Sequence, residues 1–182
     1  MPEIHCLLGG SYPADLYVED ALCSRLPWPL RRYEPLLTRH AGGRKITEMG
    51  PGLRCLDRAF GPGAEVVLIG RSSGARLATK FAALHPDRVA AVVALSYPFS
   101  HPDHGHETDR VAHLAALATP TLILQGTRDA YGGLGADRLH ELSPAVEMQF
   151  LDAGHEMQLQ PAQWDRLCAR IVQFLGDTCL CD

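Results

Sequence analysis

One stretch of the sequence, residues 65–78 (EVVLIGRSSGARLA), constrains the fold more than any other. Its first part is an apolar run that ends at Gly70, which predicts a buried strand. From Ser73 onward the apolar residues recur at helical spacing. The stretch therefore predicts a strand, a tight turn and a helix in immediate succession, with a serine in the turn.

A serine in such a turn is exposed at the end of the strand and occupies a strained backbone conformation. Small residues are needed two positions before and after it, and Gly70 and Gly74 meet this need for Ser72. For Ser73 the position two residues earlier is Arg71, which is too large. Ser72 is therefore the candidate nucleophile. A glycine-rich turn without any chemistry is the alternative at this stage.

Apolar runs and helical patterns alternate along the whole chain, which is typical of a sheet wound by helices on both faces. The sequence predicts a three-layer, doubly wound α/β fold with a mostly parallel sheet, in a single domain over residues 1–182. The segment 44–50 fits neither pattern. Strands are expected at 4–8, 30–37, 65–70, 89–95, 121–124 and 146–151, and helices at 11–26, 51–60, 73–84, 111–117, 134–142 and 161–176.

Composition excludes several classes of function. The net charge is −4 and the chain has no basic run, which argues against nucleic-acid binding. No apolar run approaches the ~20 residues that span a bilayer, and residues 1–5 do not resemble a secretory signal. The six cysteines are scattered, which favours a reduced, cytoplasmic protein, and Cys179 and Cys181 are interpreted as part of a frayed tail.

Three residues that can act together in catalysis follow three different predicted strands. Ser72 follows the strand at 65–70, Asp129 the strand at 121–124, and His155 the strand at 146–151. Functional groups collect at the carboxyl ends of parallel strands. A serine hydroxyl needs a base to remove its proton, and an imidazole base needs a carboxylate to fix its tautomer.

The sequence from about residue 65 to residue 176 resembles the α/β-hydrolase superfamily, and most of all its small, uncapped, dienelactone-hydrolase-like serine hydrolases. The segments that carry the resemblance are GRSSG at 70–74, ALSYP at 94–98, GTRD at 126–129 and GH at 154–155. The resemblance implies Ser72 as nucleophile, His155 as base and Asp129 as the acid that orients it. It implies no cofactor and no metal.

The first 60 or so residues match this family poorly, and the chain is too short for its full set of amino-terminal strands. We therefore expect a minimal version of the fold, with about six strands rather than eight. The loop after the first strand reads Leu-Gly-Gly-Ser where the family carries His-Gly. We expect an oxyanion hole built from the backbone N–H of Ser73 and a second donor from Gly10 or Ser11.

Other residues near the predicted site have alternative interpretations. Asp152 could replace Asp129, but it leaves an edge strand and is expected to reach solvent; Asp103 and Asp109 are weaker candidates still. His101, His104 and His106 could bind a metal, although a polar loop over the mouth of the site is favoured. Three further residues are candidates for substrate binding: Arg71, Tyr97 and Phe99.

These candidates for substrate binding also have structural interpretations. Arg71 is equally suited to a substrate carboxylate and to a salt bridge with Glu107 or Asp109. Tyr97 and Phe99 fit an acyl pocket and plain packing equally well.

The sequence thus predicts a serine hydrolase that cleaves small ester or thioester substrates through an acyl-enzyme, with neither a nucleic-acid nor a membrane partner. The alternative is a catalytically weak or inactive α/β-hydrolase fold used as a binding module. A further alternative is an acyltransferase that uses the same three residues. It would differ from the hydrolase only in how far water is excluded from the site. The sequence does not indicate an oligomeric state.

Overall fold

A computed structural model describes residues 2–7, 15–33, 37–39, 45–47, 49–103 and 108–179. Its main feature is a six-stranded, wholly parallel sheet with the strand order β2-β1-β5-β6-β7-β8, which confirms the predicted fold class. The strands of this sheet are β1 (Glu3–Leu7), β2 (Leu30–Arg32), β5 (Val66–Arg71), β6 (Val89–Leu95), β7 (Thr121–Gly126) and β8 (Val146–Leu151).

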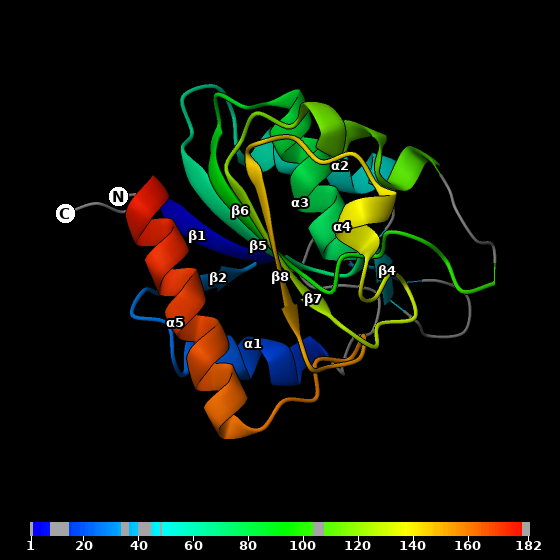
Figure 1. Cartoon of the computed structure of the whole chain (residues 1–182). Helices are drawn as coiled ribbons and strands as arrows, with labels where there is room; N and C mark the ends of the chain where they lie inside the picture. The colour runs from blue at the N-terminus through cyan, green and yellow to red at the C-terminus, as the bar shows by residue number, and fades with distance from the viewer. Residues whose placement is uncertain are drawn as a thin grey trace.

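Helices cover both faces of this sheet. Figure 1 shows α1 and α5 on one side and α2, α3 and α4 on the other. The α-helices are α1 (Asp15–Cys23), α2 (Met49–Ala59), α3 (Ser73–Leu84), α4 (Ala136–Leu139) and α5 (Pro161–Thr178), and two short 3₁₀ helices are η2 (Thr108–Arg110) and η3 (Ala112–Ala116). No described helix is both long enough and apolar enough to cross a bilayer.

The direction in which the chain adds strands reverses between β1 and β5. The chain runs from β1 outward to β2, returns to β5 on the other side of β1, and then adds β6, β7 and β8 in order. Leu7 at the end of β1 pairs with Gly70 near the end of β5. Because parallel crossovers are right-handed, the reversal sends α1 and α3 to opposite faces of the sheet. In open sheets of this kind, ligands bind outside the carboxyl ends of the strands at such a reversal.

The sheet separates two hydrophobic cores. Val67 and Ile69 of β5 pack in the core that includes α1 and α5, whereas Val66 and Leu68 pack in the core that includes α2 and α3. Such a strand is apolar on both sides, as expected for the interior of a parallel sheet. The turn that carries Ser72, at the end of β5, therefore follows a strand that is buried along its full length.

Several predicted bounds differ from the observed ones, and the helix expected at 11–26 ends at Cys23. The strand expected at 30–37 ends at Arg32, and part of the unassigned segment 44–50 is β4 (Lys45–Thr47), which pairs antiparallel with β3 (Leu37–Arg39). The helices expected at 111–117 and 134–142 are the shorter η3 and α4.

The last helix also differs from the prediction, because Gly176 does not end it and α5 continues to Thr178. The Thr178 hydroxyl donates to the carbonyl of Phe174, and the Cys179 N–H donates to that of Leu175. A glycine inside a helix costs only about 1 kcal/mol.

Candidate active site

The turn between β5 and α3 holds Ser72 in a backbone conformation that non-glycine residues rarely adopt. Its φ is 52° and its ψ is −119°, and its N–H donates to the carbonyl of Leu95 at 3.0 Å. The turn is tight because β5 and α3 touch: a Cβ on Gly70 would lie 2.6 Å from the carbonyl oxygen of Gly74. Gly70 is thus required by the close approach of two backbones, and the serine hydroxyl is held above the end of the sheet.

His155 lies in the loop between β8 and α5, opposite the serine. Its Nε2 is 2.9 Å from the Ser72 Oγ, and its Nδ1 lies 2.9 and 3.0 Å from the two carboxylate oxygens of Asp129. The structure therefore brings together, in one hydrogen-bonded chain, three residues that are up to 83 positions apart. A proton can pass along this chain from the hydroxyl to the imidazole, and the carboxylate fixes the imidazole tautomer.

Two further contacts hold the Asp129 carboxylate, which is fully buried. The Gln125 side-chain amide donates to it at 2.9 Å and also donates to the carbonyl of Gly132 at 2.7 Å. The backbone N–H of Tyr131 donates to the other carboxylate oxygen at 2.8 Å. Neither Gln125 nor Tyr131 was predicted as part of the site, because the sequence shows only that they are close to Asp129 along the chain.

The alternative candidates are placed elsewhere. Asp152 is exposed and pairs with Arg128, so it is Asp129 that faces the imidazole. Asp109 pairs with Lys80 and Arg76 on α3. Asp103 lies beside His101, to whose Nδ1 its backbone N–H donates at 3.1 Å.

Arg71 does not lie where either prediction for it places the side chain. Its side chain is only 3% exposed, and its guanidinium pairs with Asp15 and Glu156 rather than facing a substrate. It also donates to the carbonyl of His155 at 3.0 Å. The physical reason is strand alternation, which directs this side chain toward α1 and away from the serine. Glu107, one of its expected partners, lies outside the described residues.

Comparison with known families is decisive at the level of the fold. A sequence model of the alpha/beta hydrolase domain matches residues 48–172, which is more than half of the chain. The chain belongs to the α/β-hydrolase family. No curated protein matches it in a sequence search.

Several solved structures share the fold of this hydrolase. The carboxylesterase CesB from Bacillus subtilis superposes with a TM-score of 0.71 at 15% identity, over 97% of this chain and 84% of that one. An esterase from Thermogutta terrifontis gives 0.66 at 18%, over 97% and 90%. A thioesterase domain from the curacin biosynthetic pathway gives 0.66 at 15%, over 94% and 90%. At such identities the likeness concerns the fold alone.

The remaining predicted residues of the hydrolase site divide into three groups. Gly10 and Ser11, the expected second oxyanion donors, lie outside the described residues. Ser73 is the first residue of α3, where backbone N–H groups have no acceptor within the helix. Tyr97 and Phe99 have no exposed surface and pack against each other in the core, so neither lines an open acyl pocket.

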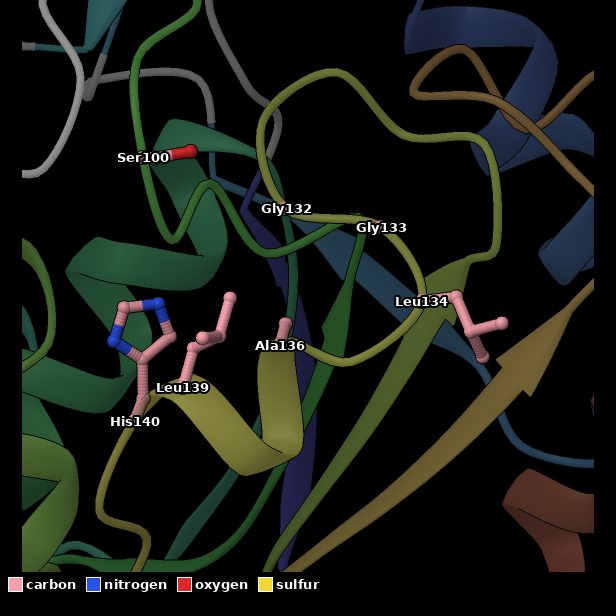
Figure 2. A pocket seen from close by; sticks show the side chains of 7 residues that line it. All are labelled: Ser100, Gly132, Gly133, Leu134, Ala136, Leu139 and His140. Atoms are coloured by element: carbon pink, nitrogen blue, oxygen red, sulfur yellow. The ribbon is translucent and has the colours of Figure 1, made fainter.

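The hydrolase has a cavity of about 390 Å³ beside the loop that carries Asp129. Figure 2 shows its walls, which come from the segment after β6, the loop after β7 and α4. Leu134 and Leu139 give it apolar, solvent-exposed edges. The residue before the cavity wall is Tyr131, whose ring lies 4.3 Å from that of His155. The full lining is Ser100, Gly132, Gly133, Leu134, Ala136, Leu139 and His140.

The histidine cluster is only partly described. The rings of His101 and Tyr131 are nearly perpendicular, with their centroids 5.6 Å apart, whereas His104 and His106 lie outside the described residues. Within the described part of the chain, no group of three or more His, Cys, Asp or Glu side chains is arranged to hold a metal ion.

Proposed function

We propose that this α/β hydrolase is a serine hydrolase that cleaves ester or thioester bonds through an acyl-enzyme. The observation that carries the proposal is the hydrogen-bonded chain from the Ser72 hydroxyl through His155 to the buried Asp129. The strained backbone at Ser72 adds support, because strain of this kind is typical of a serine presented for attack.

The first half of the reaction forms the acyl-enzyme. The Ser72 Oγ attacks the substrate carbonyl carbon while its proton moves to Nε2 of His155. The negative charge that develops on the carbonyl oxygen accepts a hydrogen bond from the Ser73 N–H, and we assign the second donor to Gly10 or Ser11. The bond to the alcohol or thiol then breaks, and the leaving group takes the proton from His155.

The second half regenerates the enzyme with the same groups. Water gives a proton to Nε2 of His155 and attacks the acyl carbon. The bond to the Ser72 Oγ breaks, and the proton returns to this oxygen. Asp129 holds the Nδ1 proton throughout and stabilises the imidazolium that forms in each half.

The cavity beside α4 supports an apolar group in the substrate. Its edges carry Leu134 and Leu139, and it begins one residue beyond Tyr131, which contacts the imidazole. A site of this kind binds a ligand mainly through apolar contact. We therefore propose a small neutral ester or thioester with an apolar chain as the substrate. We also place its action in the cytoplasm, because the cysteines of the described chain are free thiols.

A fluorophosphonate probe tests the proposal directly. The wild-type protein should be labelled, Ser72→Ala should not be labelled, and p-nitrophenyl ester hydrolysis should be lost in parallel. Ser73→Ala is the matched control, because it removes the neighbouring hydroxyl and keeps the backbone N–H. Folded wild-type protein that takes no label and cleaves no ester would contradict the proposal and favour a binding module.

A further inference from the structure

Arg71 precedes the proposed nucleophile in sequence but reaches the backbone of the proposed base. One nitrogen of its guanidinium, Nη2, lies 3.0 Å from the carbonyl oxygen of His155 and 3.0 Å from a carboxylate oxygen of Glu156. The other, Nη1, donates to the carboxylate of Asp15 on α1. One side chain thus links the end of β5, the start of α1 and the loop that carries the base.

We propose that Arg71, held by Asp15, is a positioning residue that fixes His155 opposite Ser72. The inference rests on the proposed function, because it concerns the geometry of that reaction. Arg71 ends the strand from which the serine turn starts, so a contact between its guanidinium and His155 ties the base to the same strand end as the nucleophile.

The burial of the Arg71 guanidinium indicates that it fixes the groups around it in position. Both Arg71 and Asp15 are almost completely buried, at 3% and 0% side-chain exposure. A buried ion pair adds little net stability compared with apolar side chains of similar size, because both charges lose their hydration. Its physical effect is to fix donors and acceptors in place, and the planar guanidinium can serve several acceptors at once.

The loop itself needs external support. Met157 has a φ of 52°, which is unusual for a residue with a side chain, and Gly154 immediately precedes His155 in the same loop. Arg71 holds its first part through His155 and Glu156. Tyr17 of α1 holds the second part: its hydroxyl donates to the carbonyl of Met157 and accepts from the Leu159 N–H at 3.0 Å.

The two supports can be separated by substitution. Arg71→Met with Asp15→Leu removes the ion pair and fills its place with apolar atoms, so that the fold is kept while the donor to His155 is lost. Tyr17→Phe is the matched control, because it removes hydrogen bonds from the same loop without touching His155. Arg71→Lys keeps a charge beside Asp15 but cannot reach all three acceptors from a single ammonium group.

The measurement is the rate of fluorophosphonate labelling at Ser72, together with the melting temperature. We expect labelling by the double variant and by Arg71→Lys to be roughly 10- to 100-fold slower, because small errors in position are costly in catalysis. Tyr17→Phe should lower the melting temperature and label at nearly the wild-type rate. A double variant that melts near the wild-type temperature but is labelled slowly would separate a positioning role of Arg71 from a purely structural one.

Two results would overturn the inference, and they differ from each other. If the double variant, or Arg71→Lys should the double variant not fold, labels as fast as wild type, Arg71 does not position the base and the proposed function stands. If the wild-type protein is not labelled at all, the proposed function fails and the inference fails with it.

Discussion

The backbone of Gly70 lies directly against that of Ala75. A Cβ at position 70 would lie 2.7 Å from both the Cα and the N of Ala75. These are backbone atoms, so they cannot rotate away. We expect Gly70→Ala to push β5 and α3 apart, to destabilise the protein by about 1–3 kcal/mol, and to slow Ser72 labelling. Urea unfolding and probe labelling check this. Gly61→Ala is the control, because a Cβ there meets nothing within 4 Å; equal behaviour of the two variants would contradict the prediction.

The carboxylate that faces His155 can be tested by a change that keeps its shape. Asp129→Asn should leave the fold intact but stabilise the wrong imidazole tautomer, so that kcat for ester hydrolysis falls by about 10⁴-fold. Asp152→Asn, at the exposed partner of Arg128, should hydrolyse esters at the wild-type rate. Steady-state kinetics on a p-nitrophenyl ester compare them, and a large loss in the Asp152 variant alone would refute the assignment.

The cavity beside α4 predicts a chain-length effect. Leu139→Asp places a charge on its apolar edge, which should lower kcat/KM for longer acyl chains by roughly 10-fold and leave acetate esters nearly unchanged. The control is Leu84→Asp on α3, because Leu84 is also exposed but does not line the cavity. A panel of p-nitrophenyl esters from acetate to octanoate makes the measurement. An unchanged profile in Leu139→Asp would place the acyl chain elsewhere.

His113 makes stability depend on pH. Burial lowers its pKa from 6.5 to about 4, and the nearby Lys80 and Arg76 act in the same direction against Asp109. The unfolded chain therefore binds a proton between these values that the folded chain does not, so stability is full above pH 6.5 and falls as the pH drops toward 4. Between pH 7 and pH 5 the loss from this one group should be about 2 kcal/mol.

The variant His113→Gln tests this dependence by removing the titrating group. Urea unfolding at the two pH values should show a smaller loss for the variant than for the wild type. Some loss should remain, because burial also lowers the pKa of His5. Equal losses in both proteins would show that His113 titrates normally.

The part of the site that was predictable from sequence depends on local patterns. Ser72, Asp129 and His155 each follow a predicted strand, and the carboxyl ends of parallel strands lie at one edge of the sheet. The positions of the strands in the sequence are therefore enough to predict that these residues lie at the same edge of the sheet.

The surroundings of Arg71 could not be predicted in this way. Its contacts depend on how α1 lies across the sheet, which places Asp15 against a side chain 56 positions later. The sequence shows an arginine beside the serine but not which face of β5 it leaves. The same holds for Gln125, whose amide meets Asp129 only because the turn after β7 folds back over the end of the strand.

In a parallel sheet every strand begins at one edge and ends at the other, and the proposed active site lies at the edge where the strands end. The turn at 61–64 lies at the opposite edge, and its Pro62 and Gly63 are exposed just before β5 starts. The length of β5 puts about 20 Å between this turn and Ser72. A fluorophore, affinity handle or surface tether inserted there would leave the mouth of the site open to substrate, which makes the turn a natural attachment point for immobilising the protein.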